Sequence, residues 1–205
     1  MRKFAPFLLY IAMWLAGSLW TLFLIPELHY EVIIITILDS IVFKSLIWVV
    51  PFFLMKKMQW KELFGKPFPW LACLVFICIT VAFLHTLRLL NGLQNTHLIF
   101  DPMIIVFSLS AGVLEELSFR GGFFAWQEHM AGFWPAAILN GVIFTMYHFP
   151  ELLLGQWQGL ISFRGGLIFM MGIVFCWMYK RWKNIALNMT VHTVWDIICY
   201  IFCLT

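Results

Sequence analysis

The sequence predicts an all-α protein, a polytopic transmembrane bundle of about seven helices that encloses a polar catalytic cavity. Of its 205 residues 63% are hydrophobic and only 11% are charged, and the mean hydropathy is +0.92. A soluble domain of this size needs more polar surface than such a chain supplies. Long apolar runs recur along the whole sequence, separated by short polar segments, which is typical of a chain that crosses a bilayer several times.

Seven apolar segments are long enough to be considered as membrane helices. They cover residues 5–25, 32–54, 69–90, 102–118, 133–149, 165–179 and 185–204. The segments that begin at 102, 133 and 165 are short for a full crossing, so we expect them to tilt, to continue as interfacial helix or to border a wet cavity. Gly121-Gly122 predicts a helix break after the fourth segment. Because no repeat or flexible linker divides the chain, residues 1–205 are expected to form a single integral membrane domain.

The distribution of basic residues predicts the orientation, because Lys and Arg near helix ends tend to stay in the cytoplasm. With the N-terminus inside, ten basic residues fall in inside loops, whereas only Arg88 and Arg164 fall outside. The ten are Arg2, Lys3, Lys56, Lys57, Lys61, Lys66, Arg120, Lys180, Arg181 and Lys183. We therefore expect a cytoplasmic N-terminus and an external C-terminus, in a bacterial plasma membrane.

Charge and motifs exclude several function classes. The net charge is only +3, and the basic residues form short loop clusters rather than a stripe, so nucleic acid is not an expected partner. The chain lacks G-x-S-x-G, a Walker A loop and G-x-G-x-x-G, which argues against serine hydrolase, P-loop and dinucleotide chemistry. Asn188-Met189-Thr190 matches a glycosylation sequon, but it lies inside the last predicted helix and is rejected.

Ionisable residues inside apolar segments need a partner or a purpose, because one charge at a bilayer centre costs roughly 2.5–3.5 kcal/mol. Asp39 and Lys44 are five positions apart, about 140° around a helix, so they are interpreted as separate interhelical contacts or cavity lining. His85 and Arg88 lie near a helix end, where long side chains reach the interface.

The end of the fourth segment carries two adjacent glutamates. Glu116 and Arg120 are spaced i, i+4 and are expected to pair on one helix face. Glu115 is rotated by about 100° from that pair and has no charged partner nearby in the sequence. It is therefore the candidate for acid–base chemistry.

Two later segments carry histidines at helical spacing from other notable residues. His148 follows Phe144 by one turn, and His192 precedes Asp196 by one turn. The second spacing places an imidazole and a carboxylate on the same helix face. A glutamate, two histidines and an aspartate on three segments are hard to explain as independent packing choices.

At these residues the chain resembles the CAAX-protease and bacteriocin-processing family, also called Abi proteins. Glu-Glu-x-x-x-Arg at 115–120, Phe-x-x-x-His at 144–148 and His-x-x-x-Asp at 192–196 look like its three motifs, in the same order. The resemblance covers a core of about residues 100–203. It implies an intramembrane endopeptidase of the glutamic type, which uses no metal or other cofactor.

By this resemblance, Glu115 and His148 would activate a water, and His192 with Asp196 would stabilise the oxyanion. Glu116, Arg120 and Phe144 would support these residues. Asp196 departs from the best-known CaaX-processing members, which have Asn there, and an ionised Asp cannot donate a hydrogen bond to an oxyanion. Asp196 is therefore expected either to orient His192 or to be protonated in a desolvated site.

The expected substrate is a peptide or protein precursor, such as a bacteriocin leader or a signalling peptide, and membrane lipid is the other expected partner. The sequence indicates no oligomeric state. Two alternatives stay open. Glu115, His148 and His192 could bind zinc in a zinc-dependent membrane protease, or the chain could be a non-catalytic membrane scaffold or bacteriocin-immunity protein. A proton-coupled transporter would be expected to show internal repeats, which the sequence lacks.

Overall fold

The computed structural model describes residues 5–20, 37–50, 60–92, 101–153 and 161–202. Within these ranges the chain forms eight α-helices and three π-helical segments, without a β-strand, so the all-α prediction is confirmed. The elements are α1 Ala5–Leu19, η2 Leu38–Phe43, η3 Ser45–Val49, α4 Trp60–Leu63, α5 Trp70–Leu90, α6 Pro102–Glu116, η5 Leu117–Phe124, α7 Ala125–Ala131, α8 Phe133–Leu153, α9 Ile161–Trp182 and α10 Ile185–Ile201.

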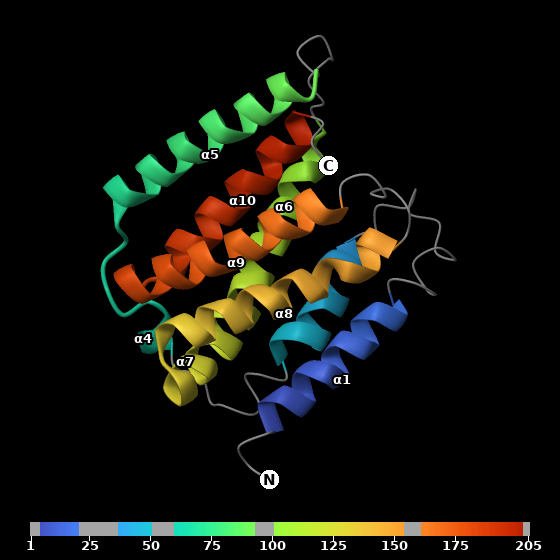
Figure 1. Cartoon of the computed structure of the whole chain (residues 1–205), viewed down its shortest axis with the longest axis vertical. Helices are drawn as coiled ribbons and strands as arrows, with labels where there is room; N and C mark the ends of the chain where they lie inside the picture. Colours follow the sequence, from blue (N-terminus) through green and yellow to red (C-terminus); the bar gives the residue numbers. More distant parts are fainter. Residues whose placement is uncertain (1–4, 21–36, 51–59, 93–100, 154–160, 203–205) are drawn as a thin grey trace.

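The long helices lie side by side and together form a bundle (Figure 1). α10 packs against α5, α6 and α9, and α8 packs against α9. The start of α1 and the end of α10 lie at opposite ends of the molecule (Figure 1). Parts of the predicted segments, 21–25, 32–36, 51–54 and 203–204, lie outside the described residues, as do the basic residues Arg2, Lys3, Lys56 and Lys57.

Two polar residues begin the helices that carry the candidate site. Asp101 caps α6, where its side chain accepts a hydrogen bond from the Met103 amide at 2.9 Å, and Pro102 occupies the first helical position. Asn184 caps α10 and accepts from the Ala186 amide at 3.0 Å. Because a side-chain oxygen satisfies an otherwise unpaired amide of the first turn, these residues fix where each helix starts.

The predicted break at Gly121-Gly122 is wrong. α6, η5 and α7 follow one another without interruption, and both glycines are buried inside the π-helical segment η5. The helix ends instead before Gly132, whose φ of 79° lies in the region that glycine adopts readily. Arg120, expected in an inside loop, is therefore a buried helical residue. α8 and α9 are also longer than their predicted segments, at 21 and 22 residues.

Close approach between helices depends on glycine at two contacts. A Cβ on Gly112 of α6 would lie 2.3 Å from Thr193 Oγ1 of α10, and one on Gly172 of α9 would lie 2.7 Å from the Cα of Gly141 in α8. Real Cβ atoms do not approach this closely, so small residues allow these backbones to meet. The two contacts bring α6 to α10 and α8 to α9, the helices that surround the candidate site.

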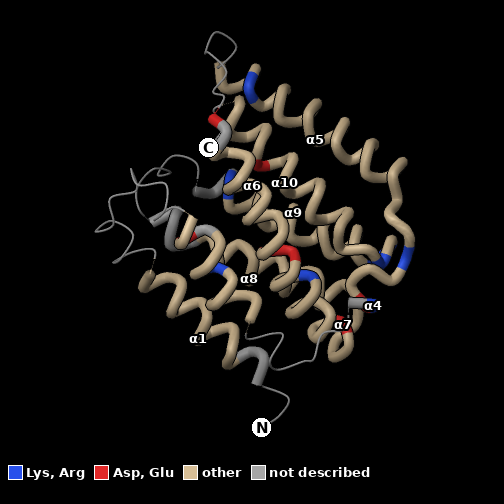
Figure 2. Tube along the Cα trace, turned by 180° about the vertical axis from the view of Figure 1, so that it is seen from behind, with Lys and Arg blue, Asp and Glu red and all other residues tan. Residues whose placement is uncertain are grey.

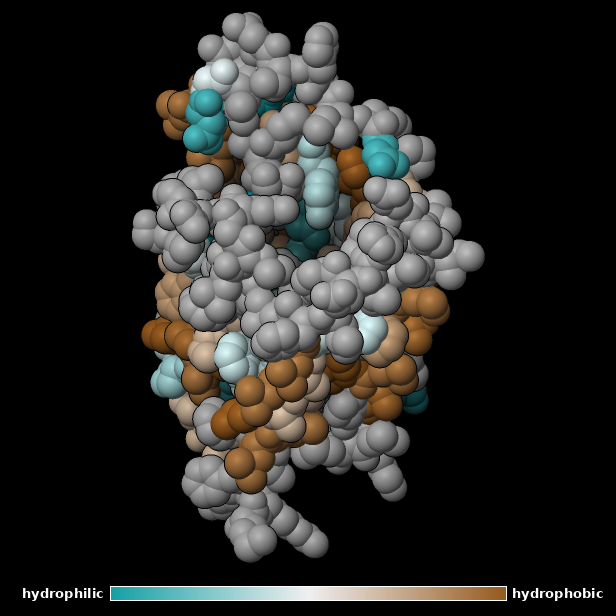
Figure 3. Space-filling view, turned by 90° about the vertical axis from the view of Figure 1, so that its right-hand side faces the viewer, coloured by the Kyte–Doolittle hydropathy of each residue, from teal (hydrophilic) through white to brown (hydrophobic). Residues whose placement is uncertain are grey.

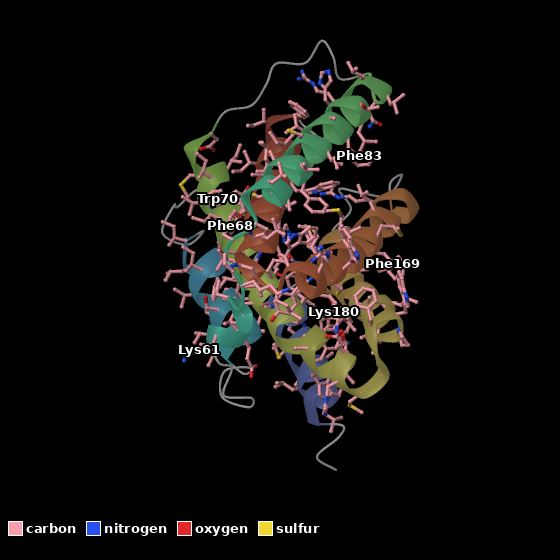
Figure 4. The ribbon with its side chains drawn as sticks, turned by 90° about the vertical axis from the view of Figure 1, so that its left-hand side faces the viewer. Lys61, Phe68, Trp70, Phe83, Phe169 and Lys180 are labelled. Atoms are coloured by element: carbon pink, nitrogen blue, oxygen red, sulfur yellow. The ribbon has the colours of Figure 1, made fainter. Side chains whose placement is uncertain are left out.

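The described surface is rich in apolar side chains. Trp70 and Leu90, at the two ends of α5, are 78% and 77% exposed, and Figure 3 shows apolar residues over much of the described surface on one side of the molecule. Figure 4 shows α5 from the side, with Trp70 and Phe83 labelled. Among the described residues, α5 is the one helix that is long and apolar enough to cross a membrane, and Leu8–Leu19 and Ile185–Ile201 are shorter apolar helices.

Candidate active site

The residues predicted for the site come from α6, η5, α8 and α10, and they meet inside the bundle. Figure 2 shows acidic and basic positions in the middle of the bundle as well as at its ends. Glu115 and Glu116 occupy the last turn of α6, His148 lies on α8, and His192 with Asp196 lies on α10. The site therefore depends on the packing of α10 against α6 and of α8 against α9 and η5, which no local sequence pattern specifies.

Glu116 is fully buried and has a hydrogen-bond partner for each carboxylate oxygen. Its Oε1 accepts from Arg120 Nη1 at 2.8 Å and lies 2.9 Å from His192 Nδ1. Its Oε2 accepts from Asn188 Nδ2 at 3.2 Å. Arg120 is also fully buried, so the predicted i, i+4 pair is present as a buried ion pair. We call Glu116, Arg120 and Asn188 the Glu116 network.

Two aromatic rings enclose the Arg120 guanidinium. Its Cζ lies 4.3 Å from the Phe144 ring centre and 5.0 Å from that of Phe175, and Nη2 donates to the Gly172 carbonyl at 3.4 Å. A planar cation with aromatic faces and a carboxylate around it is held in one orientation. Phe144 therefore contacts the Glu116 network as well as the histidines.

Glu115 has different surroundings from Glu116. Its Oε2 atom is buried and accepts no hydrogen bond from the described residues. Two imidazole nitrogen atoms, His148 Nε2 and His192 Nε2, each lie 3.7 Å from it. His192 Nε2 also lies 3.7 Å from Asp196 Oδ2. We call Glu115, His148, His192 and Asp196 the Glu115 cluster.

The Glu116 network decides how the His192 ring faces the Glu115 cluster. Because Glu116 forms an ion pair with Arg120, it is a carboxylate and acts only as an acceptor. His192 Nδ1 therefore carries a hydrogen and donates it to Glu116, which leaves Nε2 directed at Glu115 and Asp196. Glu116 thus orients the His192 ring, and Glu115 faces the Nε2 edge of that ring.

Aromatic rings form one side of the Glu115 cluster. The Phe144 ring centre lies 5.0 Å from the His148 ring and 6.0 Å from the His192 ring, both edge to face. The Tyr147 ring lies 4.9 Å from His148. These contacts limit the orientations open to both imidazoles. Phe144 and His148, one helical turn apart in the sequence, are therefore in direct ring contact.

The structure brings together all seven residues predicted for the site: Glu115, Glu116, Arg120, Phe144, His148, His192 and Asp196. Asn188 and Phe175 belong to the same assembly and were missed. Asn188 is one helical turn before His192, so the spacing 188, 192, 196 could have revealed it, whereas no sequence signal marks Phe175. Asp39, expected to make an interhelical contact or to line a cavity, accepts a hydrogen bond from the Trp20 indole.

The three residues expected to bind zinc in the alternative mechanism are Glu115, His148 and His192, and Glu115 Oε2 lies 3.7 Å from the Nε2 atom of each histidine. Within the described ranges, however, no group of three or more His, Cys, Asp or Glu side chains has the arrangement of a metal site.

The fold and the site define an all-helical protein with carboxylates and imidazoles gathered inside its bundle. Residues 97–198 match the family model described as Rce1-like, type II CAAX prenyl endopeptidase, which spans nearly the whole core predicted from the three motifs. No curated protein and no solved structure matches the chain. Through these residues the chain belongs to the CAAX-protease family. It is therefore a CAAX-type membrane protease in general terms, with a peptide or protein as its class of substrate.

Proposed function

We propose that this protein is an intramembrane endopeptidase of the glutamic type, which hydrolyses a peptide bond in a peptide or protein precursor. The observation that carries this proposal is the position of Glu115. Its Oε2 lies 3.7 Å from two imidazole Nε2 atoms, which is too long for direct hydrogen bonds. A single water could bridge groups at this separation, and a carboxylate with an imidazole can then remove its proton.

The proposed reaction needs no covalent intermediate. Glu115, assisted by His148, takes a proton from water as the hydroxide attacks the carbonyl carbon of the scissile bond. The carbonyl oxygen becomes an oxyanion, and His192, when protonated at Nε2, donates a hydrogen bond to it. The carbon–nitrogen bond then breaks, and the proton held by Glu115 passes to the leaving amine. Water is consumed and two peptide fragments are released.

The remaining residues act by holding these groups in place. Glu116 accepts from His192 Nδ1 and thereby directs Nε2 toward the reacting atoms. Arg120 neutralises Glu116, and Phe144 contacts both histidine rings. Asp196, 3.7 Å from the same Nε2, is assigned to the imidazole rather than to the oxyanion, because an ionised carboxylate has no hydrogen to donate.

We also propose that the chain is polytopic, with its N-terminus in the cytoplasm. Support comes from the basic residues at one end of the bundle. The Lys66 amide donates to the Lys183 carbonyl, so the turn before α10 meets the segment before α5. The Tyr179 hydroxyl of α9 donates to the Glu62 carbonyl of α4, and Lys61 and Lys180 lie on these two helices (Figure 4). Such a cluster is typical of a cytoplasmic face.

The orientation can be tested by labelling from each side of the membrane. Lys61→Cys and Asn91→Cys, made in a background without the native cysteines, place one thiol near each end of the bundle. An impermeant reagent applied from outside should label the cysteine at position 91 and not the one at 61. The reverse pattern would overturn the proposed orientation.

The function is tested with the purified full-length chain and a panel of synthetic precursor peptides, some with a prenylated cysteine and some without. Mass spectrometry should show cleavage by the wild type and none by Glu115→Gln, and the masses of the fragments identify the bond. Lys61→Met, a change at an exposed end of the bundle, is the matched control and should cleave as the wild type does.

The two alternatives predict other outcomes in the same assay. If cleavage stopped with a strong chelator and returned with Zn²⁺, the zinc-dependent mechanism would replace the metal-free one. If Glu115→Gln cleaved as well as the wild type, Glu115 would not be the base. A biological role that survived Glu115→Gln unchanged would support the scaffold or bacteriocin-immunity alternative.

A further inference from the structure

α8, the helix that carries His148, contains a proline two residues after that histidine. Pro150 lies inside the helix, which continues to Leu153. In an α-helix each backbone amide donates to the carbonyl four residues earlier, but proline has no backbone N–H. The Met146 carbonyl is therefore left without its usual helical donor. The missing hydrogen bond spans the turn that contains His148.

A side chain of α1 donates to this carbonyl. Trp14 Nε1 lies 2.6 Å from the Met146 carbonyl oxygen, and one turn earlier the Tyr10 hydroxyl donates to the Ile143 carbonyl at 2.8 Å. An indole N–H is a donor only, so it matches an acceptor that has lost its helical partner. Within a membrane, where lipid offers no hydrogen bonds, a helical proline is tolerated when a neighbouring element satisfies the freed carbonyl. Trp14 makes this contact.

The position of α1 is fixed by its packing against the aromatic side of the candidate site. α1 packs against η3, and the Tyr10 ring, which is buried, contacts Phe123 edge to face at 5.1 Å. The Trp48 ring of η3 contacts Tyr147 edge to face at 4.7 Å, and Tyr147 contacts His148. α1 and η3 therefore hold the same part of α8, one through backbone carbonyls and the other through a ring.

We propose that Trp14 is a positioning residue of the active site: its indole N–H replaces the helical hydrogen bond lost at Pro150 and thereby holds the turn that carries His148. The assignment rests on the proposed function, in which His148 assists Glu115. Trp14 acts through the backbone of α8 rather than on the reacting atoms. α1, outside the part of the chain that matches the family model, thus holds a residue of one of the three motifs in place.

A double-mutant cycle tests this assignment, with the variants Trp14→Phe, Pro150→Ala and the two combined. Trp14→Phe keeps an aromatic ring and removes the donor. In the peptide-cleavage assay, we expect it to lower kcat roughly tenfold, as when a catalytic group is misplaced, with KM nearly unchanged. Pro150→Ala supplies the amide that the helix lacks, so in that background Trp14→Phe should change kcat by less than about twofold. Trp134→Phe, at a 66% exposed position of the same helix, is the control for loss of an indole N–H.

The NMR signals of the His148 imidazole give a readout that needs no substrate. In protein with isotope-labelled histidine, these signals are assigned by their absence from the spectrum of His148→Gln. Trp14→Phe should shift them and leave the signals of His129, an exposed residue of α7, in place. In the Pro150→Ala background the shift should be smaller. A general loss of stability would not move one histidine selectively.

Results of three kinds would overturn the assignment. An unchanged kcat for Trp14→Phe would show that the indole N–H does not position the site. Equal losses from this change in both backgrounds would show that it does not replace the hydrogen bond missing at Pro150. A higher KM with unchanged kcat would show that Trp14 binds substrate instead. If the wild type cleaved no peptide, the proposed function would fail, and the His148 signals would still decide whether Trp14 holds that turn.

Discussion

Glu115 and Glu116 are neighbours in the sequence, yet their surroundings are opposite. Glu116 is fully buried and contacts donors from Arg120, His192 and Asn188 at hydrogen-bond distance. Glu115 Oε2 is buried without a hydrogen bond from the described residues, and its nearest imidazoles are 3.7 Å away. A buried polar group without a partner costs stability, which proteins tolerate mainly at functional sites. The hydrogen bonds of the Glu116 network are those of a stabilising element, whereas the incomplete hydrogen bonding of the Glu115 cluster supports its proposed role as the reacting group.

The largest effect on stability is expected from Arg120→Met. This change leaves Glu116 as an uncompensated buried charge and should lower the free energy of unfolding by about 3–5 kcal/mol. Thermal unfolding of the purified protein in detergent measures it. Arg181→Met, at the exposed end of α9, is the matched control and should change stability by less than about 1 kcal/mol. If both variants unfolded together with the wild type, the Glu116 network would not stabilise the fold.

A smaller loss is expected from Asn188→Leu. The amide donates to Glu116 Oε2 and to the Phe175 carbonyl at 2.7 Å, and leucine leaves both acceptors without that donor. The expected cost is about 1–3 kcal/mol, again measured by thermal unfolding. Asn91→Leu, at the exposed end of α5, should cost less than about 1 kcal/mol. Equal melting temperatures for the two variants would contradict the role given to Asn188.

The smallest change in stability is expected from Glu115→Gln. Because the Glu115 oxygen lacks a hydrogen bond in the folded protein, its replacement should leave the free energy of unfolding unchanged or raise it by up to about 1 kcal/mol. The cleavage rate should nevertheless fall by roughly 10²- to 10⁴-fold, the usual contribution of a general base. A variant that unfolded as readily as Arg120→Met would remove the distinction between the two glutamates.

Local patterns predicted several features correctly. Apolar runs separated by polar segments predicted an all-α chain, and the segments expected to begin at 102 and 185 are helices that begin there. The i, i+4 spacings predicted the Glu116–Arg120 pair and placed His192 beside Asp196, because residues one turn apart share a helix face. The three motifs predicted the family. Gly121-Gly122 was a false signal, since glycine is accepted inside a helix that is buried among neighbours.

Patterns among residues one or two turns apart were therefore enough to predict the helices, the local pairs and the family. Which side chains meet across helices depends on tertiary packing. The contacts of Glu115 with His148 and His192, of Asn188 with Glu116, and of Trp48 with Ser118 join positions far apart in the chain. They depend on how closely α6 approaches α10 at Gly112 and on how η3 packs against η5. Helical periodicity predicts on which face of a helix a residue lies, but it does not predict which other helix packs against that face.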